Sequence, residues 1–230
     1  MPGALVRFAL VAAVALAAPF GAFAQTAPSA GEIASYRGLH AAAARGDVAA
    51  IERLAAAGGL DARDGHGRTP LHVATFARQR GAAKALLAAG ADHALLDDDR
   101  YDAVTIAAVA DDDETLALLL AGGASAKLVT SRYDGTALIA AAHLGHDGVV
   151  RRLIAAGAPL DHVNNLHWTA MIESIVLGDG GQHHQATLAA LLGAGASTAL
   201  ADRGGRTPLA LARDRGYGAM VRMLEAAGAR

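Results

Sequence analysis

The chain has 230 residues, no cysteine and a formal net charge of −2. Hydrophobic residues make up 53% of it and aromatic residues only 4%, which favours closely packed helices rich in alanine and leucine over an aromatic β-sandwich. The small net charge and the lack of a lysine- or arginine-rich run argue against nucleic acid as a partner, and the missing cysteines exclude a disulfide framework and a cysteine nucleophile.

The N-terminal residues 1–24 have the pattern of a secretory signal peptide. Arg7 supplies a positive charge, residues 8–18 are an uninterrupted apolar run, and Pro19 and a small-residue site follow. The apolar run is shorter than the ~20 residues that span a bilayer, so a membrane anchor is disfavoured. We predict cleavage between Ala24 and Gln25, a periplasmic or secreted mature chain without a membrane span, and a linker over residues 25–34.

From residue 35 onward the sequence repeats with a period close to 33 residues. Thr69-Pro70-Leu71-His72 opens one unit, because threonine can cap a helix and proline fits its first turn. A Leu-Leu-x-x-Gly-Ala close follows about 21 residues later and predicts a second helix that stops at glycine, here Gly90. Such a unit is too small to bury both faces and must stack on its neighbours. The repeats are predicted at 35–63, 64–97, 98–130, 131–164, 165–202 and 203–230.

These openings and closes, with the Gly145-His146 turn between helices, resemble ankyrin repeats. The resemblance covers residues 35–230 and implies an all-α fold, an α-solenoid of about six helix-turn-helix units with short hairpin loops, capped at both ends. It also implies a scaffold that acts as a monomer, needs no cofactor, is not an enzyme and binds a protein partner in a concave groove. The candidate groove contacts are His66, Arg68, Asp99, Tyr101, Arg132, Tyr133, Leu166, Trp168 and Arg206. Exported bacterial proteins of this kind include some placed in oxidative stress protection or toxin inhibition, and no residue here selects between such roles.

The fifth repeat departs from the pattern in length. Its opening lies 38 residues before the next one, so it holds about five extra residues, which fall within 178–184 between its two helices. One interpretation is a tolerated surface insertion. The other is a binding loop in which His183 and His184 act as ligands or hydrogen-bond donors.

The same repeat carries an acid at a core position. Four residues after the opening, the other repeats have Ala41, Val73, Ile106, Ala140 and Leu211, whereas the fifth has Glu173. A buried carboxylate needs a partner or a raised pKa. Glu173 is either bonded to backbone, Trp168 or Ser174, or it is a ligand or proton-transfer group. Trp168, the only tryptophan, is either an exposed groove anchor or packs under its hairpin.

An alternative function follows from these departures: a small-molecule or metal site, with or without enzymatic activity, formed by Glu173, Asp179, His183 and His184. Histidine and carboxylate are ordinary metal ligands. However, no spacing matches H-E-x-x-H, and the chain has neither G-x-S-x-G nor a P-loop. We therefore predict no metal and place the protein-binding scaffold first.

Overall fold

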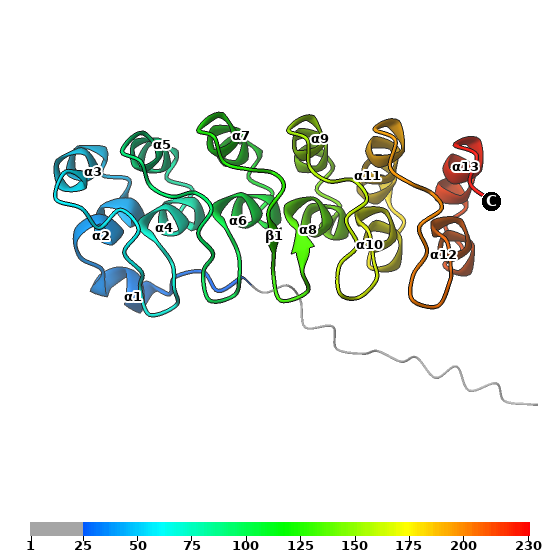
Figure 1. Ribbon diagram of the computed structural model, residues 1–230, viewed down its shortest axis with the longest axis horizontal. Helices are drawn as coiled ribbons and strands as arrows, with labels where there is room; N and C mark the ends of the chain where they lie inside the picture. The colour runs from blue at the N-terminus through cyan, green and yellow to red at the C-terminus, as the bar shows by residue number, and fades with distance from the viewer. Residues whose placement is uncertain (1–24) are drawn as a thin grey trace, which may run out of the picture.

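The structure, a computed structural model, describes residues 25–230, so the predicted signal peptide lies outside the described residues. Figure 1 shows helix pairs stacked side by side in two rows, which agrees with the predicted all-α solenoid. The inner row is α2 (Gly38–Arg45), α4 (Pro70–Phe76), α6 (Ala103–Val109), α8 (Ala137–Leu144), α10 (Ala170–Val176) and α12 (Pro208–Asp214). The outer row is α3 (Val48–Ala55), α5 (Arg80–Ala88), α7 (Asp113–Ala121), α9 (Asp147–Ala155), α11 (Gln182–Gly193) and α13 (Gly218–Ala226). No helix within residues 25–230 is both long and apolar enough to cross a membrane.

The inner helices from α4 onward each begin at a side chain that caps them. Thr69 Oγ1 accepts from the His72 amide (3.4 Å), and His72 Nδ1 accepts from the Thr69 amide (2.9 Å), which satisfies two donors of the first turn. The other ring nitrogen of His72 lies 3.0 Å from the Leu95 carbonyl oxygen and so ties the helix to the next hairpin. Burial lowers the pKa of His72 to about 4, which keeps the ring neutral in this role. The in-register caps of the later repeats are Asp102, Thr136, Thr169 and Thr207.

The core lies between the two rows and extends through every repeat. Each outer helix from α5 onward has a fully buried leucine near its C-terminal end: Leu86, Leu119, Leu153, Leu191 and Leu224. Opposite them a small residue of each inner helix lets the rows approach closely: Ala42, Ala74, Ala107, Ala141, Ser174 and Ala212. Ser174, the one polar member, donates to the Met171 carbonyl (2.9 Å). Stacking on its neighbours thus buries the apolar surface that a single repeat would leave exposed to water.

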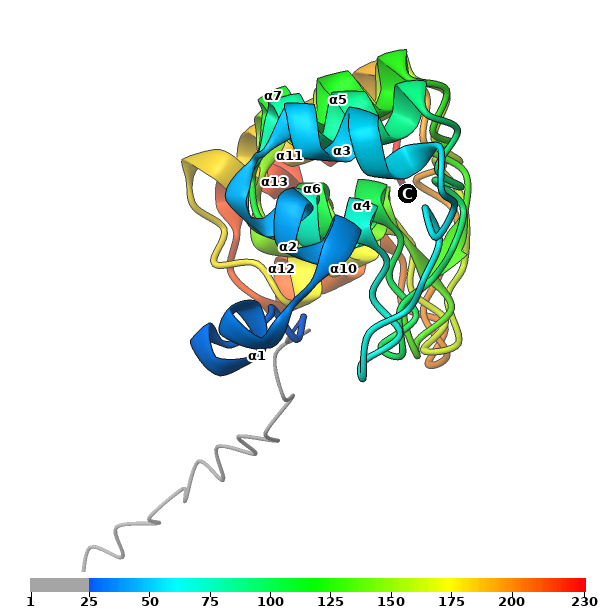
Figure 2. The same ribbon diagram turned by 90° about the vertical axis from the view of Figure 1, so that its left-hand side faces the viewer.

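Hairpin loops join the repeats and project away from the helices on one side, at an angle to the inner row (Figure 2). Among the described residues, strand pairing occurs in one of them, between β1 (Val129–Thr130) and β2 (Gly135–Thr136). The tips are linked by backbone hydrogen bonds from Asp98 to His66 (3.1 Å) and from Asn165 to Tyr133 (3.0 Å). We call the surface enclosed by the hairpins and the inner row the concave face.

One position of each hairpin, two residues before the helix cap, has a left-handed backbone. The φ angles are 68° at Gly67, 65° at Arg100, 52° at Asp134, 65° at His167 and 74° at Gly205. Glycine adopts this conformation freely, whereas a residue with a Cβ is strained there by about 1–2 kcal/mol. The three central repeats therefore carry strain at their hairpin tips that the second and sixth repeats avoid.

We expect His167→Gly to raise the free energy of unfolding by about 1 kcal/mol, because it removes this strain and loses only a 3.3 Å contact with Arg203. Urea titration followed by circular dichroism measures the change. Val163→Gly, in the same hairpin but outside the left-handed positions, is the matched control and should lower stability instead. Equal losses in both variants would contradict the strain assignment.

The segment predicted as a linker, residues 25–34, is different in the structure. It contains most of helix α1 (Ala30–Ser35), which starts with a capping box: Ser29 Oγ accepts from the Glu32 amide and the Glu32 carboxylate accepts from the Ser29 amide. Figures 1 and 2 show α1 below α2, on the side of the inner row that faces away from the outer row. The segment is therefore packed on the repeats and does not bridge to them as a free tether.

The insertion of the fifth repeat is divided between a helix and a loop. Helices α5, α7, α9 and α13 have 9 residues each, whereas α11 has 12. The loop before it, residues 177–181, is two residues longer than the corresponding loop 77–79. His183 and His184 consequently lie in the first turn of α11 and not in the loop itself.

Candidate functional site: the concave face

The residues immediately before the helix caps form a line along the concave face, which we call the groove row: Arg68, Tyr101, Gly135, Trp168 and Arg206. Exposure along it is uneven. Arg68 is 0% exposed and Tyr101 is 4% exposed, Trp168 is half-buried against the core, and the Arg206 side chain is 56% exposed. The predicted contacts Arg68 and Tyr101 are thus closed to an outside partner, while the C-terminal half of the row is open.

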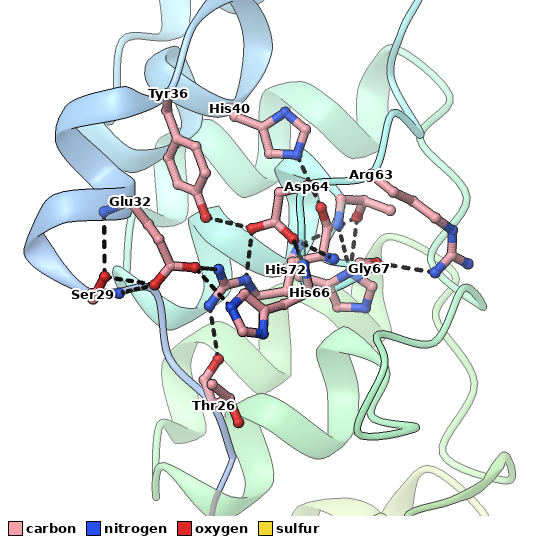
Figure 3. Close-up of polar contacts among 12 residues, drawn as sticks. Thr26, Ser29, Glu32, Tyr36, His40, Arg63, Asp64, His66, Gly67 and His72 are labelled. Carbon is pink, nitrogen blue, oxygen red and sulfur yellow. Dashed lines mark hydrogen bonds and ion pairs between the residues drawn. The ribbon is translucent and has the colours of Figure 1, made fainter.

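Arg68 is buried because the N-terminal segment covers it (Figure 3). Its Nε donates to Asp64 Oδ2 (2.7 Å), Nη1 donates to the Thr26 carbonyl (2.9 Å) and Nη2 donates to the Glu32 carboxylate. Tyr36 Oη donates to the same oxygen of Asp64 (2.6 Å). One guanidinium thus joins the hairpin of the second repeat to two points of the N-terminal segment, and its charge is matched by two carboxylates.

Both carboxylates are held in the ionised form. Hydrogen bonds from Ser29 and then Arg68 lower the pKa of Glu32 to about 2. Burial acts to raise the pKa of Asp64, but hydrogen bonds from Tyr36, from the backbone and from Arg68 outweigh it and bring the value to about 2. The network is therefore fully charged at neutral pH.

The N-terminal segment continues along the concave face into the third repeat. Thr26 Oγ1 donates to Asp99 Oδ2 (2.6 Å), and Gln25 Nε2 donates to the Thr105 carbonyl of α6 (3.2 Å). His66 Nε2 lies 3.2 Å from Glu32 Oε1. The predicted groove residues His66, Arg68 and Asp99 thus already contact a peptide segment, and that segment is the chain's own.

Beyond the covered region, the predicted contacts belong to the hairpins and the groove row. Arg132 is exposed and pairs with Asp99 (Nη2 to Oδ1, 3.1 Å). Tyr133 and Leu166 are half-buried. Trp168 is both partly exposed and packed against the core, so the two interpretations of this residue each describe a part of it. The sequence did not show that part of this surface is covered by the N-terminal segment.

Glu173 is fully buried and has partners, as expected, although they differ from those expected. Asn164 Nδ2 donates to its Oε1 (2.8 Å), and His143 Nδ1 lies 3.4 Å from Oε2. Burial raises the pKa of Glu173, and the contacts with His143 and Asn164 oppose that shift only in part. The sequence predicted a partner or a raised pKa for a buried Glu173, and here the residue has two partners and a pKa shifted upward by burial.

Asn164 explains why this repeat accepts an acid. Its Oδ1 accepts from the amides of Leu166 and Trp168 (both 3.0 Å), a hairpin role that Asp64 and Asp202 have in their repeats. An aspartate at this position would place a second hydrogen-bond acceptor against Glu173, whereas the amide group of asparagine places a donor there. Aligning the hairpin positions across the repeats would have exposed this coupled change.

The predicted fifth-repeat site is not a single site. Asp179, His183 and His184 line a depression of about 400 Å³ together with Asp147 and Arg151, and Glu173 is not among its lining residues. Three ring nitrogens of the two histidines have partners within the chain: His183 Nδ1 is 3.0 Å from Asp147, His184 Nδ1 is 2.8 Å from Asp179, and His184 Nε2 is 3.0 Å from the His143 carbonyl. His143 connects the depression to Glu173, because its carbonyl contacts His184 and its Nδ1 lies 3.4 Å from Glu173 Oε2. Over residues 25–230 no group of three or more acidic or histidine side chains is arranged to hold a metal ion.

The residues that sequence reasoning missed are Glu32, Tyr36, Asp64 and Asn164. A signal for one of them was present, because Ser29-x-x-Glu32 has the spacing of a capping box and marks a helix start inside the presumed linker.

Comparisons with known proteins agree with the repeat geometry. A family model described as ankyrin repeats (3 copies) matches residues 23–97 and 104–198. The curated ankyrin repeat protein YahD of Escherichia coli (strain K12) is 35% identical over 190 residues, which cover 82% of this chain and 94% of YahD. A solved ankyrin repeat domain from Acinetobacter baumannii AYE is 45% identical with a TM-score of 0.79, covering 84% of this chain and 98% of that domain. The ankyrin repeat domain of Bcl-3 is 28% identical with a TM-score of 0.76, and the match covers 85% of this chain and 87% of that domain. The capped inner helices, the stacked hairpins and these matches show that the chain belongs to the ankyrin repeat family.

Proposed function

We propose that this protein is an exported, monomeric scaffold that binds a protein partner on the C-terminal half of its concave face. Ankyrin repeats generally mediate protein–protein interaction, and proteins built from them are typically not enzymes. The observation that carries the proposal is the uneven exposure of the groove row, which is covered at Arg68 and open at Trp168 and Arg206. Tryptophan and arginine are the residue types most often found at binding hot spots.

Combining Trp168→Ala with Arg206→Ala is expected to weaken partner binding by at least about 30-fold, since loss of a hot spot removes ~2 kcal/mol or more. The partner is first captured by photo-crosslinking from position 203 in the exporting cell, and its affinity for each variant is then measured with purified proteins. Arg222→Ala, an exposed arginine on the outer helix α13, is the matched control and should bind as the wild type does. Equal affinity for all variants would refute the assignment of this surface.

Export is part of the same proposal and is supported by the pattern of residues 1–24. When the full chain is expressed in Escherichia coli, N-terminal sequencing of the periplasmic fraction should find a chain that starts at Gln25. A cytoplasmic product that retains residues 1–24 would remove export from the proposal and leave partner binding untouched.

A further inference from the structure

Arg68 and Arg206 occupy the same position of the repeat, but Arg68 is buried whereas Arg206 is exposed. Each stands on the groove row directly before a helix-capping threonine, and each has an aspartate four residues earlier, Asp64 or Asp202. In both pairs Nε of the arginine donates to Oδ2 of the aspartate, at 2.7 Å in the second repeat and 3.0 Å in the sixth. In both, Oδ1 of the aspartate accepts from the arginine's own backbone amide (2.9 Å). The hairpins therefore hold the two guanidinium groups in matching positions.

The two arginines differ in what lies over them. At Arg68 the remaining donors bind the Glu32 carboxylate and the Thr26 carbonyl, both from the N-terminal segment, and no exposed surface remains. At Arg206, Nη2 also donates to Asp202 Oδ2 (2.7 Å), and the nearest oxygen of Asp214 is 3.8 Å from Nη1, too far for a hydrogen bond. Of the five N–H donors of a guanidinium, Asp202 thus takes two.

Charge around Arg206 favours an acidic ligand. Residues 202–230, which include Asp202, contain six arginines and three acidic residues, a net charge of +3, in a chain whose total is −2. Arg203, on the same hairpin, is also exposed. Two carboxylates, Asp64 and Glu32, bind the guanidinium of Arg68, whereas at Arg206 only Asp202, among the carboxylates of the described residues, lies at hydrogen-bond distance.

Trp168 supplies a partly exposed apolar side chain at the same register position of the preceding repeat. It precedes Arg206 on the groove row, and helices α10 and α12 of the two repeats pack side by side. An aromatic ring beside an unfilled guanidinium can anchor a short peptide segment by its apolar side chains while the arginine takes a carboxylate.

We propose that Arg206, held by Asp202 and followed on the groove row by no other repeat, forms with Trp168 of the preceding repeat a carboxylate-binding position for an acidic peptide segment of the partner. It binds that segment as Arg68 binds Glu32 of the chain's own N-terminal segment. The proposal rests on the function proposed above and gives the partner a chemistry: an exposed segment with a glutamate or aspartate next to an apolar residue.

The chain itself supplies the probe, a synthetic peptide with the sequence of residues 25–36. It contains no tryptophan, so the fluorescence of Trp168, the only tryptophan of the protein, reports binding at this position. We expect the fluorescence to titrate with the peptide, and we expect binding to weaken as salt is added. A peptide with Glu32→Gln should bind about tenfold more weakly, because a charge-assisted hydrogen bond is lost.

Two protein variants complete the test. Arg206→Gln should weaken binding of the unaltered peptide by about tenfold, and Arg222→Gln, an exposed arginine of the same repeat outside the groove row, should leave it unchanged. Circular dichroism checks that both variants remain folded. The proposal is overturned if no titration is seen, or if the Glu32→Gln peptide or the Arg206→Gln protein binds as well as the unaltered pair. Partner capture that depends on Trp168 would in that case still support the proposed function, so the two failures are distinguishable.

Discussion

Arg68→Leu is expected to lower the free energy of unfolding by about 3–5 kcal/mol, the usual loss when one member of a buried ion pair is removed. The change leaves Asp64 without its guanidinium partner, removes one of the hydrogen bonds of Glu32 and leaves the Thr26 carbonyl without its donor. Leucine cannot replace any of these hydrogen bonds. Urea unfolding monitored by circular dichroism measures the loss, and amide hydrogen exchange over residues 29–36 should show that α1 has detached.

The repeat array provides the control for this experiment. Arg206 pairs with Asp202 as Arg68 pairs with Asp64, but the Arg206 side chain is exposed. Arg206→Leu should therefore lower the free energy of unfolding by less than about 1 kcal/mol. Adding Asp64→Asn to Arg68→Leu should recover part of the loss, because the unpaired charge is then removed. Equal losses for Arg68→Leu and Arg206→Leu would show that burial of Arg68 by the N-terminal segment contributes nothing to stability.

The same network gives the protein a defined acid response. The pKa values of Glu32 and Asp64 fall from 4.5 and 3.8 to about 2 on folding, so the unfolded chain binds more protons than the native one between these values. Stability from both groups is therefore complete above about pH 4.5 and is lost as the pH falls toward 2. Arg68→Leu should be less sensitive to acid over this interval than the wild type.

Asn164→Asp is expected to destabilise the protein by about 2–4 kcal/mol at pH 8, even though aspartate occupies the matching position in repeats with Asp64, Asp97 and Asp202. The change removes the amide that donates to Glu173 Oε1 at 2.8 Å and puts a second acid in its place. Two buried carboxylates at this separation cannot both stay ionised without a large penalty. Chemical denaturation at pH 8 measures the effect.

A double-mutant cycle isolates the cause. Combining Asn164→Asp with Glu173→Leu recreates the pairing of the sixth repeat, where Asp202 is matched by Leu211 at the position of Glu173. The double variant should therefore recover about 2 kcal/mol or more relative to Asn164→Asp alone. If the two single losses simply add, the contact between the two side chains does not set the stability of this repeat.

The pH dependence of Glu173 has the opposite sign to that of Glu32. Because burial raises its pKa in the folded state, the native protein binds more protons than the unfolded one just above the ordinary value of 4.5. The stability that Glu173 contributes is therefore fully present below pH 4.5 and is lost as the pH rises through its pKa in the folded protein. Asn164→Asp should accordingly be least harmful in mildly acidic solution, where one carboxyl of the pair is protonated.

The sequence by itself determined the repeat fold, because each of its signals is local and recurs. The Thr69-Pro70 opening, the buried Leu86 position and Gly90 act over a few residues, and their repetition at one period leaves stacking as the way to bury the apolar faces. The misfit of Glu173 was visible for the same reason: an acid stood where five other repeats have an apolar residue.

Only the tertiary structure decided which part of the concave face is open. The bonds that close over Arg68 join residues 36 and 42 positions apart, and no periodic pattern specifies them because the N-terminal segment occurs once. Long-range packing also decided how the insertion of the fifth repeat is shared between a loop and a helix. Helix α11 packs between α9 and α13 and is longer than they are, which places His183 and His184 on the helix. Repetition thus determines the scaffold, whereas single-copy contacts between distant segments determine its sites.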